Sequence, residues 1–199
     1  FYSDTGDYAA LYDLSTTDFW AQWQDLPVLI KATFRQRGDQ IRTRQVPSEH
    51  LPLGSVKTSG STGIPVEIYG TSVSRGYWAA LTVRDHRTVA RDATQRYGAI
   101  RYLKKENRGE QGIRMPNWGG PVAELEQTGL GFGLHISHKP EVLAYWLGRV
   151  NPADLMTYPS VALELLRSDT RPPPALQEIN FMAEPLDREL RLELEQEWR

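Results

Sequence analysis

The chain has 199 residues, 40% of them hydrophobic, and its 23 basic and 25 acidic residues leave a net charge of −2. This length is enough to bury a hydrophobic core in one domain or in a large part of one, and the balanced charge argues against nucleic acid as a partner. The sequence has no cysteine, which excludes disulfides and thiolate metal sites. No apolar run approaches the roughly 20 residues that span a bilayer, so we expect no membrane span. The absence of cysteine is typical of a cytoplasmic protein, and we expect that location.

The first part of the chain is predicted to be helical. Ser15 followed by Asp18 is a capping pattern that starts a helix, and Trp20 and Trp23 fall on one face of that helix. A second, more polar helix is predicted over Lys31–Gln40. We expect both tryptophans to pack in the hydrophobic core.

A loop of serine, threonine and glycine between Lys57 and Glu67 is the most informative stretch of the sequence. Glycines let a backbone come close to a ligand and adopt positive φ, so successive N–H groups can converge on an anion, and the hydroxyls add uncharged donors. We therefore predict a phosphate site formed by Thr58, Ser59, Gly60, Ser61, Thr62 and Gly63. Taken alone, the stretch is equally compatible with a polar hairpin loop that binds nothing.

The β-branched run that follows this loop, Val66–Tyr69, predicts a strand, so we expect the loop to lie between two strands. A Walker-type phosphate loop opens a helix instead and needs Gly-Lys-Ser or Gly-Lys-Thr, which this stretch lacks. We therefore reject the Walker alternative.

Beyond Thr71, predicted helices and strands alternate along the chain. The apolar spacing predicts helices over Ser74–Ala93, Pro140–Val150, Ser160–Arg167 and the last residues, where Asp187 is the cap. Strands are predicted over Tyr97–Leu103, Asp154–Thr157 and Ile179–Met182. Lys104–Thr128 has no clear period and is predicted to be an irregular insertion. The alternation predicts an α/β sheet covered by helices.

The histidines and the remaining tryptophans are weaker indicators of function. His135 and His138 are spaced for a metal site on a helix, but an intervening isoleucine and nearby glycines favour a strand or turn. Two histidines without a third ligand are more often ordinary polar residues, so we predict no metal site. Trp78 and Trp146 are expected in the core, whereas Trp118, in the irregular insertion, is compatible with a ligand contact.

Four stretches together resemble the adenylate-forming enzymes, the superfamily of acyl-CoA synthetases and adenylation domains. Thr58–Pro65 is similar to the phosphate loop of this superfamily. Three others resemble its phenylacetate–CoA ligase and CapK-like branch: Pro152–Ser160 is similar to P-D-x-L-x-x-Y-P-S, Phe181–Leu186 to G-A-E-P-L, and Asp25–Lys31 to L-P-x-x-x-K. The four stretches occur in the order of the family, which makes the set more specific than the loop alone.

The resemblance implies that residues 1–199 are the N-terminal portion of the AMP-binding large domain, with a mixed sheet flanked by helices. Members of the family continue to an acidic metal-binding motif, a ribose-binding aspartate and a small domain with a catalytic lysine. We therefore expect a fragment that does not complete the reaction by itself, and we assign no catalytic residue.

The resemblance also implies a chemistry and site residues. ATP and a carboxylic acid would form an acyl-adenylate, and the acyl group would pass to the thiol of coenzyme A or of a carrier protein, with Mg²⁺ on the phosphates. Thr58–Gly63 would hold the β- and γ-phosphates. The adenine would lie against Ala183, Glu184 and Pro185, and the acyl pocket would lie near Tyr158, Pro159 and Ser160.

Some interpretations remain open at this point. Many family members have Lys or Thr where this chain has Ile64, so one phosphate contact of the family is absent. Glu184 either presents backbone groups to a ligand or stabilises the start of the helix after Asp187. The alternatives to a ligase are a non-catalytic nucleotide-binding or interaction module of this fold, and an unrelated α/β transferase that uses a nucleotide sugar.

Overall fold

The computed structural model describes residues 16–21, 28, 30, 32, 33, 35, 36, 45–57 and 66–198. It divides into two compact units, Phe1–Tyr77 and Trp78–Arg199, which we describe separately. The predicted phosphate loop, Thr58–Gly63, lies outside the described residues, as do Ile64 and Trp23. No helix in the described residues is long and apolar enough to cross a lipid bilayer.

The first unit contains a two-stranded hairpin around the predicted phosphate loop. Strand β1 (Gly54–Lys57) pairs antiparallel with β2 (Glu67–Gly70), from Gly54 opposite Gly70 to Lys57 opposite Glu67. The prediction that the loop lies between two strands is therefore confirmed. The unit also holds α1 (Thr16–Ala21), the 3₁₀ turn η3 (Ser48–His50) and the start of α3 (Ser72–Thr88).

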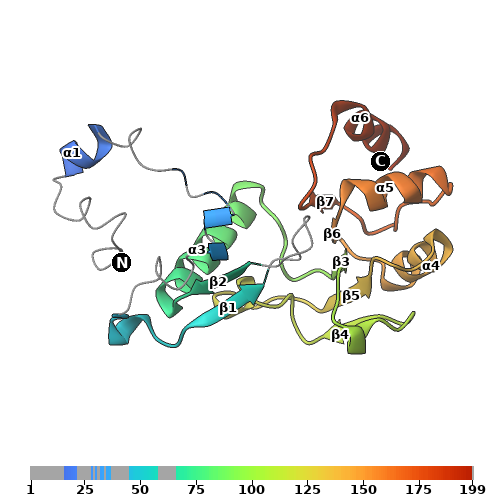
Figure 1. The fold of residues 1–199 in the computed structure, drawn as a ribbon. Coiled ribbons are helices and arrows are strands. Elements are labelled where there is room, and N and C mark those ends of the chain that lie inside the picture. Colours follow the sequence, from blue (N-terminus) through green and yellow to red (C-terminus); the bar gives the residue numbers. More distant parts are fainter. Residues whose placement is uncertain are drawn as a thin grey trace. The chain divides into compact units, whose positions relative to one another are not determined.

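The second unit contains a five-stranded sheet with the order β4-β5-β3-β6-β7 (Figure 1). Its strands are β3 (Tyr97–Arg101), β4 (Ile113–Met115), β5 (Gly131–His135), β6 (Asp154–Thr157) and β7 (Glu178–Phe181). All neighbours are parallel except β4, which runs antiparallel to β5. The predicted α/β fold with a mixed sheet is confirmed.

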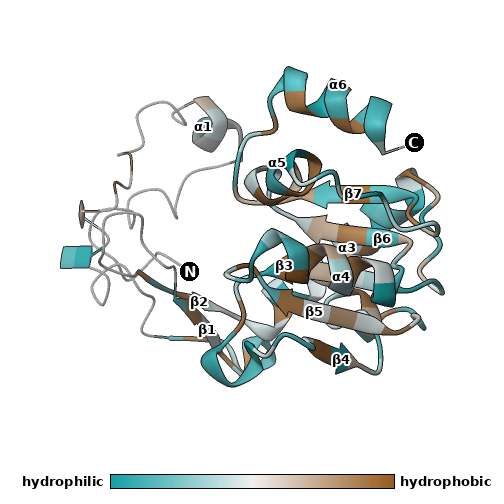
Figure 2. Ribbon diagram, turned by 90° about the vertical axis from the view of Figure 1, so that its right-hand side faces the viewer, coloured by the Kyte–Doolittle hydropathy of each residue, from teal (hydrophilic) through white to brown (hydrophobic). Residues whose placement is uncertain are grey.

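Three helices, each following a parallel strand of this sheet, pack side by side in chain order. They are α4 (Pro140–Val150), α5 (Pro159–Arg167) and α6 (Arg188–Glu197), and α5 contacts both of the others. The insertion between β3 and β5 holds two short 3₁₀ turns, η4 (Lys105–Asn107) and η5 (Val122–Glu124). In Figure 2 the outermost helix, α6, is largely hydrophilic, as expected for a helix with one buried stripe.

The main hydrophobic core lies between the central strands and helices α4 and α5. It contains Ile100, Leu134, Leu143, Trp146, Leu147, Val150, Leu155, Val161 and Leu165. A smaller cluster joins α5 to α6 through Ala162, Leu190 and Leu194. The helical spacing of apolar residues on α4 and α6 predicted that each helix buries one face, and these buried residues lie on those faces.

The predictions for the tryptophans are confirmed only in part. Trp146 is 1% exposed, but Trp20 is 64% and Trp78 66% exposed, so the core prediction for those two is wrong. Helix α3 buries Ala79, Val83 and His86 at spacings of four and three. The buried stripe of α3 therefore consists of smaller side chains, and the large aromatic residues face outward.

Trp118 belongs to the packed interior and does not face a ligand site. Its ring stacks on Tyr97 with the centroids 5.1 Å apart, and its Nε1–H donates to the carbonyl of Gln95 at 2.9 Å. Of the two alternatives for Trp118, a ligand contact or packing in the interior, the structure favours packing, because the buried indole N–H already has its partner.

A buried ion cluster lies at the amino-terminal edge of the sheet. Asp154 and Glu178 are the first residues of β6 and β7, and Arg91 lies between them with its side chain only 6% exposed. The guanidinium donates two hydrogen bonds to Glu178 and one to Asn180. Its Nε is 3.2 Å from Asp154 Oδ1, but that oxygen accepts no hydrogen bond.

Candidate functional site at the carboxyl edge of the sheet

The carboxyl ends of the parallel strands form the most suitable binding edge of the second unit. The parallel strands have the order β5-β3-β6-β7, so the chain reverses its direction of travel across the sheet between β3 and β6. Ligands of open α/β sheets bind outside the carboxyl ends at such a switch point. Tyr158–Ser160 directly follows β6, and Ala183–Pro185 follows β7 after Met182, so the fold brings these two predicted segments to one edge.

The first segment links the end of β6 to the start of α5. Thr157 is fully buried, and its hydroxyl donates to the carbonyl of Ile100 at 3.2 Å, which ties β6 to β3. Tyr158 precedes the helix and packs against the core. Pro159 is the first helical residue, where its missing N–H is tolerated. Ser160 is exposed and carries the first N–H of the helix, because Pro159 has none.

Glu184 joins the second segment to the first. Its Oε2 accepts from the amide of Ser160 and its Oε1 from the hydroxyl of Ser160, both at 2.9 Å. We call this pair of hydrogen bonds the Ser160–Glu184 clasp. The carboxylate therefore lies at the start of α5, where the helix dipole favours negative charge.

The alternative that Glu184 stabilises the start of α6 is wrong. Asp187 has that role, because its Oδ1 accepts from the amide of Leu190 at 2.8 Å. The predicted cap by Asp187 is confirmed. Glu184 caps α5 through Ser160, which lies 24 residues earlier in the chain, and spacing within one helix cannot indicate such a partner.

The backbone at Ala183 is held in an uncommon conformation. Ala183 has φ 62, and the amide of Glu184 donates to the carbonyl of Met182 at 2.9 Å. A hydrogen bond from residue i+2 to residue i around a positive φ is the rare, strained form of the γ-turn. Met182 itself is fixed, because its amide donates to the carbonyl of Thr157 at 3.0 Å. The exposed turn is thus anchored to the end of β6 through Met182 and to the start of α5 through Glu184.

Replacing Ala183 with glycine is expected to raise the free energy of unfolding by about 0.5–1 kcal/mol, because glycine adopts positive φ without the Cβ clash. Urea unfolding of the two proteins would measure the difference. Ala144→Gly in α4 is the matched control, and it should lower stability by about 1 kcal/mol, as glycine does inside helices. Equal losses for both variants would contradict the assigned strain.

A group of aromatic and basic residues follows β3 and β5 at the same edge. The Arg108 guanidinium lies 4.8 Å from the centre of the Tyr102 ring and donates to its hydroxyl at 2.7 Å. The Tyr102 ring in turn lies 5.2 Å from that of His135. From the sequence, His135 and His138 are interpreted as ordinary polar residues in preference to metal ligands. The position of His135 at the carboxyl end of β5, with His138 shortly after it, was the signal that could have placed them at this edge of the sheet.

The surroundings of His135 favour the neutral form of its ring. Burial lowers the pKa of His135, and the positive charges of Arg108 and His138 lower it further. Its Nδ1 accepts from the amide of Ser137 at 3.1 Å, so the proton of the neutral ring is on Nε2, which has no hydrogen-bond partner among the described residues. The described residues also contain no group of three potential metal ligands.

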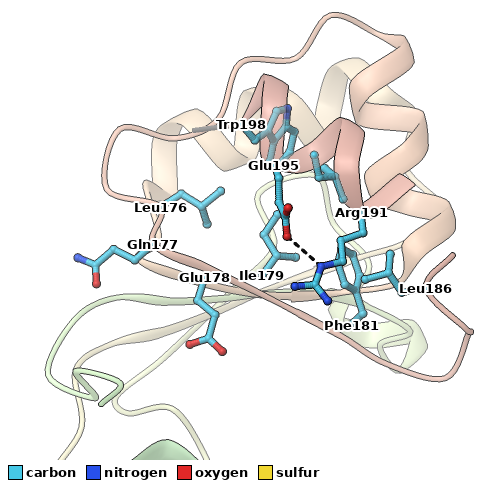
Figure 3. A pocket seen from close by; sticks show the side chains of 10 residues that line it. Leu176, Gln177, Glu178, Ile179, Phe181, Leu186, Arg191, Glu195 and Trp198 are labelled. Carbon is cyan, nitrogen blue, oxygen red and sulfur yellow. Dashed lines mark hydrogen bonds and ion pairs between the residues drawn. The ribbon is translucent and has the colours of Figure 1, made fainter. Parts of the chain in front are cut away.

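A hollow of the second unit lies away from this edge, between β7 and α6. It has a volume of about 420 Å³ and is lined by Leu176, Gln177, Glu178, Ile179, Phe181, Leu186, Arg191, Leu194, Glu195 and Trp198. Figure 3 shows Ile179 pointing toward α6, whereas Glu178 points to the other side of β7. None of the predicted site residues lines this groove.

The fold can be compared with known proteins. No protein-family model and no curated protein matches the sequence. Among solved structures, the crystal structure of 2-hydroxyisobutyryl-CoA ligase in complex with 2-HIB-AMP and CoA, in the thioesterification state, is similar, with a TM-score of 0.60 and 18% sequence identity. The match covers 92% of this chain and 40% of that one. The chain therefore has the fold of part of a CoA ligase and spans about 40% of its length.

Proposed function

We propose that this chain is the N-terminal portion of the large domain of an adenylate-forming ligase of the phenylacetate–CoA ligase or CapK-like type. The protein would activate a carboxylic acid with ATP and pass the acyl group to a thiol such as that of coenzyme A. The observation that carries this proposal is the Ser160–Glu184 clasp, which joins the two predicted ligand segments at the carboxyl edge of a sheet with a CoA-ligase fold.

The proposed chemistry depends on positioning. A carboxylate oxygen attacks the α-phosphorus of ATP and pyrophosphate leaves; the thiol sulfur then attacks the acyl carbon and AMP leaves. Both reactants of the first step are anionic, so the protein would act by holding them in line and stabilising charge. Thr58–Gly63 would hold the phosphates, the backbone of Ala183–Pro185 the adenine, and Tyr158–Ser160 the acid. No described residue is assigned to Mg²⁺, because the described residues form no metal-ligand cluster.

ATP binding to the 199-residue chain, measured by isothermal titration calorimetry, tests the proposed phosphate loop. Gly63→Val should raise the Kd for ATP at least about tenfold, because a branched side chain keeps the backbone away from the phosphates. The matched control is Gly76→Ala in α3, where an added Cβ meets nothing within 4 Å; it should leave the Kd unchanged. Absent ATP binding, or equal effects of both variants, would contradict the proposal.

The complete reaction needs a second measurement on the longer protein that contains this chain. Carboxylate-dependent exchange of pyrophosphate into ATP is expected with at least one acid of a broad panel. ATP binding without any exchange would favour the non-catalytic nucleotide-binding module, which the Ile64 departure supports. Binding of UDP-sugars in place of ATP would favour the nucleotide-sugar transferase.

A further inference from the structure

We propose that Glu184 is a positioning residue: through the Ser160–Glu184 clasp it holds the exposed turn Met182–Pro185 in the conformation that receives an adenine ring. This inference rests on the proposed function, and it adds a role for the side chain of Glu184 to the backbone role of its segment. It is carried by the capping geometry of α5, by the strain at Ala183 and by the exposure of the turn.

The start of α5 has no local cap. Tyr158 makes no capping hydrogen bond with its side chain, and Pro159 has no N–H. The amide of Ser160 is therefore the first unsatisfied donor of the helix. Glu184 satisfies this donor and also accepts from the Ser160 hydroxyl. Because each carboxylate oxygen has its own donor, the two bonds fix the orientation of the side chain as well as its distance.

The turn needs such a restraint because little else holds it. Residues 183–187 are all exposed, so packing does not restrain Ala183 in its positive-φ conformation. A strained backbone of this kind persists only where its surroundings over-determine it. The Met182–Thr157 hydrogen bond fixes the start of the turn, and the clasp fixes its end. Without the clasp, we expect the turn to relax toward ordinary backbone angles.

The chain offers a matched control for this role. Asp187 lies three residues beyond Glu184 in the same loop and also caps a helix with its carboxylate. Loss of either carboxylate removes one helix cap, which costs a similar amount of stability. Only the loss of Glu184 releases the turn from α5. A comparison of Glu184→Ala with Asp187→Ala therefore separates positioning from helix capping.

The test measures AMP binding by calorimetry and thermal unfolding for both alanine variants of the 199-residue chain. We expect similar decreases in Tm, but an increase of about tenfold in the Kd for AMP for Glu184→Ala and less than about twofold for Asp187→Ala. Glu184→Gln retains an acceptor for the Ser160 amide and should restore most of the affinity. Ser160→Ala should add little to Glu184→Ala, because both remove the same clasp.

A ligand-independent measurement accompanies the affinities. Hydrogen exchange of the Glu184 amide, which donates to Met182, should be faster in Glu184→Ala and unchanged in Asp187→Ala. Equal effects of the two alanine variants on AMP affinity and on exchange would show that Glu184 is only a cap, and would overturn the positioning role alone. Failure of the wild-type chain to bind AMP would overturn the proposed nucleotide site, and the positioning role with it.

Discussion

Replacing Arg91 with methionine should lower the free energy of unfolding by about 3–5 kcal/mol, the typical cost of removing one partner from a buried ion pair. Methionine fills much of the space of the arginine stem but leaves Asp154 and Glu178 facing each other at the start of β6 and β7. Glu178 would lose its hydrogen bonds from the guanidinium and Asp154 its ion pair, while both carboxylates would keep the cost of their burial. Chemical denaturation at pH 7 would measure the loss.

A second arginine of the same unit provides the control. Arg191 pairs with Glu195 on the surface of α6 at 2.9 Å, with the Arg191 side chain 68% exposed (Figure 3). Arg191→Met should therefore change stability by no more than about 0.5 kcal/mol. If both methionine variants had equally small effects, the ion cluster would have no structural importance.

The second large effect concerns the pH dependence of stability. The pKa of Asp154 is raised to about 6, chiefly by burial and also by the nearby Glu178 charge, against the opposing effect of Arg91. An acid with a raised pKa in the folded state keeps its proton between the unfolded and the folded value, so its contribution to stability is present near pH 4 and is lost as the pH rises through 6. At about 1.4 kcal/mol per unit, the loss amounts to roughly 3 kcal/mol.

Asp154→Asn should isolate this contribution, because the amide is similar in shape to the protonated acid and does not ionise. Relative to the wild type, the asparagine variant should gain stability from pH 4 to about 6 and stay level above it. The difference between the two proteins is the quantity to compare, because neighbouring groups titrate in the opposite sense: burial lowers the pKa of His86, and the hydrogen bond from Arg91 lowers that of Glu178. A difference that does not vary with pH would contradict the raised pKa.

Much of the fold could be predicted from periodicity, and its failures have physical causes. Helix α4 and strand β6 lie where the apolar spacing placed them. Strand β5 was predicted only as a strand or turn around His135, because Gly131 and Gly133 dilute its apolar residues. Packing requires the first of these glycines, since a Cβ at Gly131 would lie 2.4 Å from the carbonyl of Asn117. Strand β4 has only three residues and is defined by its pairing with β5.

The sequence indicated which segments form the candidate site, but it did not indicate which of their side chains contact each other. The resemblance to ligases placed Tyr158–Ser160 and Ala183–Pro185 in one site, and the parallel pairing of β6 with β7 brings them together. The partner of Glu184 could not be predicted, because the contact depends on how two strand ends align in space. The phosphate role of Thr58–Gly63 stays a prediction, since these residues lie outside the described part of the chain.

The order of strands also has a consequence for how the second unit assembles. The central strand, β3, pairs on one side with β5 and on the other with β6, so Tyr97 meets Gly131 and Asp154. During synthesis β3 therefore emerges before both of its partner strands. Each pairing also closes a long loop of chain, which costs conformational entropy. Such distant parallel contacts form slowly. We expect the unit to collapse around its helices first and to complete its sheet in the slowest step of folding.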